Sequence, residues 1–214
     1  QKRMAGFLYR NTLRLERIIN QLLELQKLEN TELVLKARRM NVTEFIREII
    51  ALFDQWAAEK NIHLSFEPEA DELYAWIDPE KMDKIIFNLL SNAIKFTPEN
   101  GLVSIILTAE GNNTREGWLS ISVMDTGKGI SKAYTERIFE RFYQVEEEQI
   151  NRSSGTGIGL HLVYELVRIH HGDIQVLSEP GKGSTFTVKI PLGDHHFLPE
   201  EKDGTDLFPG RSDG

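Results

Sequence analysis

Apolar residues near the start of the chain recur at the spacing of a helix that packs along one seam. Leu8, Leu15 and Leu22 are seven residues apart, and Ile18 and Leu25 repeat on the neighbouring row. A seven-residue repeat of apolar positions is typical of a coiled coil or a helical bundle. The pattern therefore predicts a long N-terminal helix, and it favours a helix–helix dimer seam over packing on the helix's own domain.

The next part of the chain alternates between short strands and helices. Strands are predicted over 32–42, 63–68 and 73–78 from their apolar and polar alternation. Helical spacing of apolar residues predicts one helix over 44–61 with Thr43 as its N-cap. A second helix is predicted to run from Pro79, with Asp78 as N-cap, to about Phe96.

The second half of the chain is predicted to supply most of a sheet. Strands are expected over 102–111 and 118–127, followed by a loose, charged and glycine-containing stretch over 129–157. A helix over 159–172 and a strand hairpin over 173–192 complete the pattern. These elements predict an α+β fold, a two-layer α/β sandwich whose mixed, mostly antiparallel sheet has helices on one face.

Three parts of the chain are distinguished by this pattern. Residues 1–30 form the long helix, and residues 31–193 form the layered domain. Residues 194–214 are acidic and rich in Gly, Asp and Pro, which predicts a linker or a disordered tail. A chain that starts at Gln1 is expected to be a piece of a longer protein.

Composition narrows the possible functions. The 214 residues are 40% hydrophobic and 27% charged, which is typical of a globular protein. The absence of cysteine excludes a disulfide framework and a cysteine-based metal site. A formal net charge of -8 argues against nucleic acid as a partner. No stretch reaches the ~18 apolar residues of a membrane span, so no direct membrane contact is expected of this chain.

A polar face interrupts the helix predicted over 79–96. Asn88 and Asn92 are four residues apart and Lys95 follows three later, so all three share one helical face. Asparagine is a poor helix former because its side chain competes for backbone hydrogen bonds. Two asparagines beside a lysine, just before the helix stops at Thr97, therefore mark a candidate functional face.

Two glycine-rich stretches follow this helix. "DTGKGI" (125–130) ends an alternating strand, and "GTGIGL" (155–160) immediately precedes a helix. Glycines let a ligand approach the backbone, and the N–H groups at a helix N-terminus favour phosphate. Taken alone, the first stretch also fits a plain turn and the second a flexible start of a helix. A dinucleotide site is disfavoured, because no clean parallel strand precedes the second stretch.

In combination and in this order, these stretches resemble the ATP-binding domain of sensor histidine kinases. "NLLSNAIKFT" (88–97) resembles the N box, "DTGKGI" the first glycine box, "IFERFYQ" (138–144) the F box and "GTGIGL" the second glycine box. The wider family includes type II topoisomerases, heat-shock chaperones and MutL. The resemblance covers roughly residues 32–192, including the hairpin "GKGSTF". The first helix resembles the second helix of the kinase dimerisation domain, whose first helix is absent.

The resemblance implies that ATP and Mg²⁺ are the cofactors. Asn92 resembles the magnesium ligand, Asn88 completes the polar face, and Lys95 places a cation near the phosphates. Phe96 resembles the aromatic residue that lies against adenine, and Asp125 the carboxylate that accepts a hydrogen bond from the adenine amino group. The remaining residues implied to bind the nucleotide are Gly127, Gly129, Ile130, Phe139, Tyr143, Gly155, Thr156, Gly157, Gly159, Leu160 and Thr185.

The residue at position 88 separates the subfamilies. Hydrolytic members carry a glutamate there as general base, and an asparagine is not an effective base. The chain is therefore expected to bind ATP for another nucleophile, which in the kinases is a histidine on the first dimerisation helix. Many kinases of the family also carry an arginine after the F-box tyrosine, where this chain has Gln144. Asn88, Lys95 and Arg152 are the candidate catalytic residues, with Arg152 in place of that arginine.

None of the chain's own histidines stands in the H-E-x-x-x-P-like context of a phosphoacceptor. Each is expected to have a structural or solvent role, and the pair at the end of the 159–172 helix to favour its C-terminus as imidazolium. The six are His63, His161, His170, His171, His195 and His196. The phosphoacceptor is therefore expected upstream, and the chain alone is expected not to autophosphorylate.

The leading hypothesis is the catalytic core of a two-component sensor histidine kinase. The alternatives are an ATP hydrolase or chaperone-like ATPase with the same fold, and a non-catalytic dimeric signalling module. The kinase hypothesis implies that the intact protein is a homodimer through the N-terminal helix and that its partner is a response-regulator receiver domain. The local sequence, including "FYQ" and "PLGDHHF", resembles that of the hybrid kinases of Bacteroides-type bacteria, in which a receiver domain is fused C-terminally. The resemblance places the chain in the cytoplasmic portion of a bacterial protein anchored in the inner membrane.

Overall fold

The computed structural model describes residues 34–113, 116–144 and 156–203, together with Ile19, Leu22, Leu23 and Gln26. Most of the predicted N-terminal helix therefore lies outside the described residues, as do Arg152, Gly155 and residues 204–214. Within the described part, Leu22 packs against the main hydrophobic core. The dimer seam and the domain limits predicted at the two ends of the chain stay predictions.

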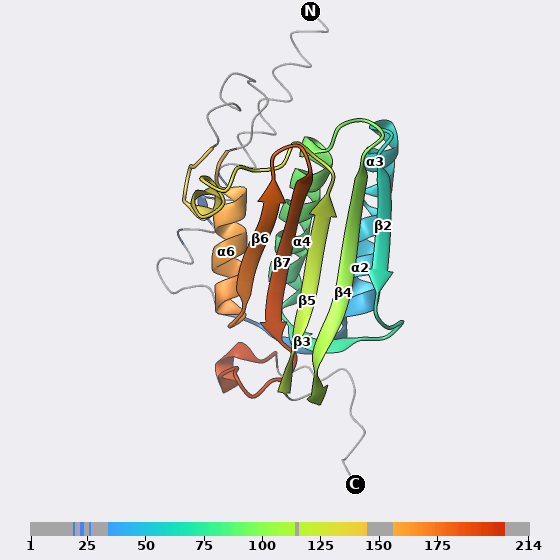
Figure 1. The fold of residues 1–214 in the computed structure, drawn as a ribbon. Coiled ribbons are helices and arrows are strands. Elements are labelled where there is room, and N and C mark those ends of the chain that lie inside the picture. The colour runs from blue at the N-terminus through green and yellow to red at the C-terminus, as the bar shows by residue number, and fades with distance from the viewer. Residues whose placement is uncertain are drawn as a thin grey trace, which may run out of the picture.

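A five-stranded sheet forms one layer of the domain. Its spatial order is β2 (His63–Pro68), β4 (Leu102–Asn113), β5 (Glu116–Asp125), β7 (Gly183–Pro191) and β6 (Asp173–Glu179). The β2–β4 pair is parallel and the other three pairs are antiparallel. This arrangement confirms the predicted mixed, mostly antiparallel sheet (Figure 1).

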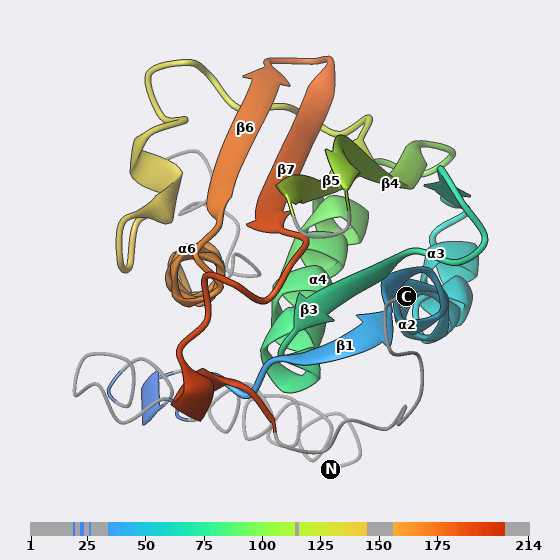
Figure 2. The same cartoon turned by 90° about the horizontal axis from the view of Figure 1, so that it is seen from below.

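Helices cover one face of this sheet, as the two views show (Figures 1 and 2). They are α2 (Val42–Ala51), α3 (Asp54–Glu59), α4 (Pro79–Phe96) and α6 (Gly159–Ile169). The apolar residues of α4 recur every three or four positions, and those of β5 alternate, so both elements bury one face in a shared core. A second, two-stranded antiparallel sheet joins β1 (Arg38–Asn41) to β3 (Tyr74–Ile77).

The single helix predicted over 44–61 is wrong, because the structure has two helices there. The N-cap is Asn41 and not Thr43: the Asn41 side chain accepts hydrogen bonds from the N–H groups of Thr43 and Glu44 at 3.1 and 3.4 Å. The Thr43 hydroxyl is buried and donates to the carbonyl of Ala70. The break between α2 and α3 brings Phe53 into the core, 4.9 Å from the ring of Phe87.

Residues 194–203 fold back onto the domain, which differs from the tail expected there. The segment includes a 3-10 turn, η2 (Pro199–Glu201), and Phe197 is buried against Leu35 and Ala37. Ala37 donates its N–H to the carbonyl of Glu201 at 2.7 Å, and its carbonyl accepts from Asp203 at 2.8 Å. A buried aromatic ring and a short backbone pairing thus hold this segment, despite its acidic sequence.

His170 connects the end of α6 to the start of α4. Its Nε2 accepts the N–H of Asp78 at 3.2 Å, so its Nδ1 carries the proton and donates to the carbonyl of Leu166 at 2.8 Å. The ring is fully buried, and this burial lowers the pKa of His170. The expectation of an imidazolium cation at the helix end is therefore wrong for His170, which is a neutral structural residue.

Candidate functional site

The two asparagines of α4 lie half-buried on one face of the helix, as predicted. The Asn88 amide donates from Nδ2 to the carbonyl of Lys84 at 2.8 Å. Its Oδ1 consequently faces the start of α6, where a Cβ added to Gly159 would lie 2.7 Å from that oxygen. The first of the three predicted stretches thus meets the last, although they are about seventy residues apart in sequence.

The helix α4 ends just after its polar face, where the side chain of Thr97 caps it. The Thr97 hydroxyl donates to the carbonyl of Ala93 at 2.6 Å, and Thr97 itself adopts an extended backbone ahead of Pro98. The last helical residue, Phe96, has two ammonium groups over its ring, from Lys95 at 4.3 Å and Lys128 at 5.0 Å. This end of α4 therefore combines a half-buried aromatic ring with local positive charge.

Phe96 also packs against the first glycine stretch. A Cβ added to Gly127 would come within 2.7 Å of the Phe96 carbonyl oxygen, so only glycine fits at this approach of two backbones. The N–H of Gly127 donates to Oδ1 of Asp125 at 2.7 Å. Phe96 and Asp125 are thereby brought to the two sides of one glycine.

Asp125 ends β5 and is nearly buried, with 7% of its surface exposed. Burial raises the pKa of its carboxyl group, while hydrogen bonds from the backbone of Gly127 and Ser184 oppose that rise. These bonds fix the orientation of the carboxylate inside the domain. A buried oxygen with a fixed orientation is suited to accept a hydrogen bond from a donor group on a flat ligand.

Two residues of the first glycine stretch bind the neighbouring hairpin. Gly129 has a left-handed φ of +68°, and an added Cβ would clash with the carbonyl of Glu179. Ile130 donates its N–H to Oγ of Ser178 at 2.7 Å. The Ser178 hydroxyl also donates to the carbonyl of Gly183 at 2.9 Å. Gly129 and Ile130 therefore attach the stretch to the β6–β7 hairpin, a role that the glycine spacing alone did not reveal.

The described part of the second glycine stretch lies beside the F box. Gly157 has a left-handed φ of +69°, and its carbonyl accepts the N–H of Phe142 at 2.9 Å. Thr156 accepts the N–H of Ile158 at 3.3 Å, and Leu160 is half-buried against the core. The start of α6 is thus held from both sides, next to Asn88.

The F-box aromatic residues pack within the domain. Phe139, in η1 (Arg137–Phe139), lies 6.0 Å from the ring of Tyr164 and 6.5 Å from that of Phe186. The Phe139 carbonyl accepts a hydrogen bond from Nδ1 of His161 at 2.9 Å. Tyr143 lies 6.4 Å from Tyr134 and 4.4 Å from the guanidinium of Arg137. Phe139 and Tyr143 therefore belong to the packing that surrounds the second glycine stretch.

The structure places Ser184, rather than Thr185, beside Asp125. The two residues are register partners in the β5–β7 pair, and Ser184 is buried like Asp125. Thr185 alternates to the other face of β7, where it pairs with half-exposed Met124. The sequence shows the alternation of each strand, but the register between two distant strands decides which hydroxyl meets the carboxylate.

The predicted metal ligand is consistent with a nucleotide-bound metal. Among the described residues no group of three or more His, Cys, Asp or Glu could hold a metal ion. Asn92, half-buried one turn after Asn88, offers one amide oxygen. Mg²⁺ is commonly held by one or two protein oxygens together with phosphates and waters. The residues present therefore fit Mg²⁺ that arrives with a triphosphate.

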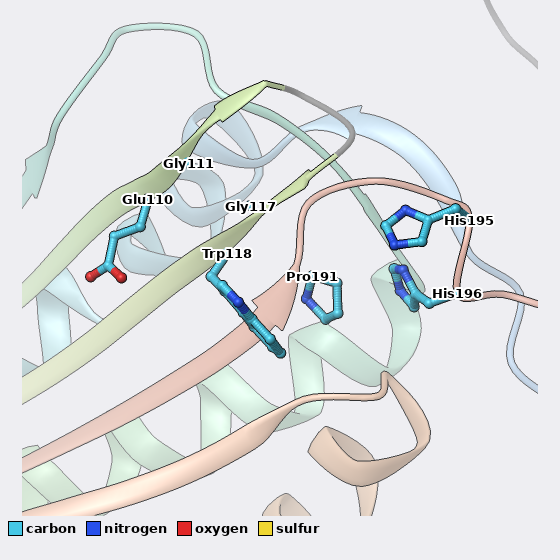
Figure 3. Close-up of a pocket in the computed structure, with 7 residues that line it drawn as sticks. All are labelled: Glu110, Gly111, Gly117, Trp118, Pro191, His195 and His196. Carbon is cyan, nitrogen blue, oxygen red and sulfur yellow. The ribbon is translucent and has the colours of Figure 1, made fainter.

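A separate cavity of about 600 Å³ lies at the opposite end of β5 from Asp125 (Figure 3). It is lined by Glu110, Gly111, Gly117, Trp118, Pro191, His195 and His196. Burial, with the neighbouring histidines, lowers the pKa of His196 to about 4, so its ring is neutral at neutral pH. The lining of this cavity includes none of Asn88, Phe96 and Asp125.

The domain that carries the N box and the glycine boxes belongs to a known protein family. Residues 77–194, more than half of the chain, match the family described as histidine kinase-, DNA gyrase B-, and HSP90-like ATPase. The chain belongs to this family, and its domain is the ATP-binding domain of the histidine kinase type. In the part of the chain that the structure describes, no helix is long and apolar enough to cross a membrane.

Named relatives agree with this assignment. The sensor histidine kinase TmoS of Ectopseudomonas mendocina is 40% identical over 183 residues, which cover 86% of this chain and 18% of that protein. The structure of full-length ShkA in complex with AMPPNP matches with a TM-score of 0.76 at 26% identity, covering 90% of this chain and 39% of that one. Histidine kinase ThkA, in complex with the response regulator protein TrrA, matches with a TM-score of 0.72 at 27% identity, covering 92% and 52% of the two chains.

Proposed function

We propose that this chain is the catalytic core of a sensor histidine protein kinase, which transfers the γ-phosphoryl group of ATP to a histidine outside the chain. The observation that carries the proposal is that the N-box helix α4 meets both glycine boxes, at Asn88–Gly159 and at Phe96–Gly127. The second contact also orients Asp125, through the N–H of Gly127. The AMPPNP complex of ShkA supports ATP as the ligand.

Adenine recognition is assigned to Asp125 and Phe96. The Asp125 carboxylate, oriented by the N–H of Gly127, accepts a hydrogen bond from the exocyclic amino group of adenine. A guanine presents a carbonyl oxygen at that position, and two acceptors facing each other in a buried site are unfavourable. The ring of Phe96 lies against the flat face of the base, and Lys95 and Lys128 add positive charge beside it.

The phosphate end of the ATP is assigned to α4 and the start of α6. Asn92 supplies an amide oxygen to Mg²⁺, which neutralises charge on the phosphates when bound. Lys95 adds a cation, and the N-terminus of α6 at Gly159 offers backbone N–H groups to phosphate oxygens. Arg152 is proposed to take the place of the arginine that Gln144 replaces.

The proposal includes a weak capacity for ATP hydrolysis. The side chain that faces Gly159 is an amide, and an amide neither removes nor stores a proton near neutral pH. Asn88 therefore orients its surroundings without activating water, so the γ-phosphoryl group is kept for a histidine. This property distinguishes the kinase from a hydrolase or chaperone-like ATPase with the same fold.

The intact protein is proposed to be a homodimer through its N-terminal helix. A receiver domain of a response regulator is the proposed partner, and the complex of ThkA with TrrA supports it. From the similarity to sensor kinases, the chain is also proposed to be part of the cytoplasmic portion of a membrane-anchored bacterial protein. The chain spans 18% of TmoS, so the activity and partners of the whole protein are part of this proposal.

Phosphate transfer tests the function directly. The chain is extended upstream to include the first dimerisation helix and incubated with Mg²⁺ and γ-labelled ATP. The proposal predicts acid-labile, base-stable label on the protein, and its loss in Asn92→Ala. Steady ATP turnover by the unextended chain would instead favour the hydrolase. ATP binding without label on the extended protein would favour the non-catalytic module.

A further inference from the structure

A turn between α3 and β2 lies against the end of α4. The ammonium group of Lys60 donates to the carbonyls of Ile94 at 2.7 Å, Lys95 at 3.2 Å and Thr97 at 3.3 Å. An ammonium group has three N–H donors, so all of them are directed at the backbone around this helix end. The last carbonyls of a helix have no partner within the helix and carry partial negative charge.

The residue after Lys60 extends this contact to the loop that follows α4. The Asn61 side chain donates to a carboxylate oxygen of Glu99 at 2.6 Å, and the Asn61 carbonyl accepts the N–H of Asn100 at 3.0 Å. Both asparagines have a left-handed backbone, with φ of +52° and +65°. Lys60 and Asn61 thus form a bracket around the end of α4, which we name the α4 bracket.

The backbone held by the α4 bracket is the backbone that meets the nucleotide site. Lys60 binds the carbonyl before and the carbonyl after Phe96. The Phe96 carbonyl packs against Gly127 with no room for a methyl group, and Gly127 orients Asp125. A displacement of the α4 end by even a fraction of an ångström would therefore change the distance between the Phe96 ring and the Asp125 carboxylate.

We propose that Lys60 is a positioning residue for nucleotide binding: its ammonium group holds the end of α4 so that Phe96 and Asp125 face the same base. The proposal rests on the proposed function of this site. Lys60 contacts no part of the nucleotide in this assignment and acts through the α4 backbone. It therefore adds a residue from outside the four motifs to the determinants of affinity.

Three variants separate this role from a general effect on folding. Lys60→Met keeps the length of the side chain but removes the charge and all three donors, whereas Lys60→Arg keeps a cation with several donors. Lys202→Met is the matched control, because Lys202 pairs with Asp194 at 2.8 Å in the segment after β7, away from the site. Affinity for ATP with Mg²⁺ is measured by calorimetry, and amide hydrogen exchange is measured without nucleotide.

We expect Lys60→Met to weaken ATP binding about ten-fold, because a released α4 end leaves only about a tenth of the unbound molecules with Phe96 and Asp125 in the binding geometry. The amide of Thr97, bonded to Ala93 at 3.0 Å, is expected to exchange faster in the same variant. Lys60→Arg restores most of the affinity, and Lys202→Met leaves both affinity and Thr97 exchange unchanged.

Each other outcome decides against the proposal. Unchanged affinity in Lys60→Met would overturn it, even with faster exchange at Thr97, while the proposed function would stand. An equal loss of affinity in Lys202→Met would show a general effect of stability. If Lys60→Met does not fold, Asn61→Ala tests the same bracket, and parental affinity there together with failed rescue by Lys60→Arg would overturn it. A parent chain that binds no ATP would instead end the proposed function.

Discussion

Gly159 lies so close to Asn88 that a methyl group added to it would come within 2.7 Å of the Asn88 amide oxygen. The contact joins the start of α6 to the polar face of α4, and α4 and α6 pack side by side under the sheet (Figure 2). The start of α6, which is proposed to face the phosphates, is thereby set against Asn88, the side chain that is proposed to disfavour hydrolysis.

This contact predicts that Gly159→Ala affects binding much more than stability. Alanine is a better helix former than glycine by about 1 kcal/mol, but its Cβ forces the Asn88 amide to move. We expect ATP binding about ten-fold weaker, or about 1.4 kcal/mol, with little loss of thermal stability. Calorimetry and thermal unfolding measure the two quantities.

Gly117→Ala is the control for that substitution. Gly117 lies at the opposite end of β5 from Asp125, and an added Cβ would come within 2.5 Å of the Glu110 carbonyl oxygen, so alanine is strained there without touching the site. We expect a loss of about 1 kcal/mol in unfolding free energy and unchanged ATP affinity. Parental ATP affinity in Gly159→Ala would contradict the assigned contact.

The buried carboxylate of Asp125 is expected to lower the unfolding free energy of the domain, although it is proposed to bind adenine. Its pKa is raised by burial, so its contribution to stability is greatest below the unfolded value near 3.8 and declines as the pH rises through the folded value. Asp125→Asn removes the buried charge and is expected to raise the unfolding free energy at pH 7 by about 1 kcal/mol. Denaturant unfolding without nucleotide, at pH 7 and pH 4, measures it. A variant that is less stable than the parent at pH 7 would show that the carboxylate is favourably solvated.

His170 predicts a loss of stability in mild acid. Burial lowers its pKa, so the unfolded chain takes up a proton below about pH 6.5 that the folded chain refuses. Nearby Asp78 opposes this shift, while Lys81 and His171 add to it. The His170 contribution to the unfolding free energy should fall by up to about 1.4 kcal/mol per pH unit below that point, and His196, whose pKa is also lowered, adds to the fall.

Urea unfolding at pH 7.5 and 5.5 checks this expectation against two variants. His170→Gln has no titrating ring and should show a smaller fall. His63→Gln changes an exposed histidine of β2 and should keep the parental fall. Equal slopes in the parent and His170→Gln would contradict the assignment of the proton uptake to His170.

The segment after β7 is predicted to stabilise the domain through Phe197. Its ring is 5% exposed and packs with Leu35 and Ala37, so Phe197→Ala should cost about 3 kcal/mol. The adjacent Leu198 is 56% exposed, and Leu198→Ala should cost less than about 0.5 kcal/mol. Denaturant unfolding of the two variants compares them, and equal small losses would mean that this packing does not contribute to the fold.

The sequence was sufficient to predict the elements that carry strong local patterns. The helix α4 has its N-cap at Asp78, Pro79 as first residue and its end at Phe96, as predicted, because capping and periodicity are local properties. Among the described residues, Asn88 meets the second glycine stretch at Gly159, and Asp125 meets the end of α4 at Phe96, across Gly127. That Asn92, Asp125 and residues 155–159 face one nucleotide stays a prediction. Here the resemblance supplied the long-range information that periodicity lacks.

What the sequence did not predict depends on contacts between distant residues. Thr43 resembled an N-cap, but its hydroxyl is engaged by the carbonyl of Ala70 and Asn41 takes its place. Ser184 rather than Thr185 faces Asp125 because of the strand register. The proposed role of Lys60 lies outside every motif, since it rests on two carbonyls at the end of α4 and that of Thr97 just after it.

A calorimetric comparison of ATP and GTP tests the central claim, that these residues form one adenine-nucleotide site. The parent chain with Mg²⁺ should bind ATP, bind GTP at least about ten-fold more weakly, and lose ATP affinity in Asp125→Asn. The exposed β6 carboxylate variant Asp173→Asn should bind like the parent. No heat of binding at millimolar ATP, or an Asp125→Asn variant with parental affinity and selectivity, would contradict the account.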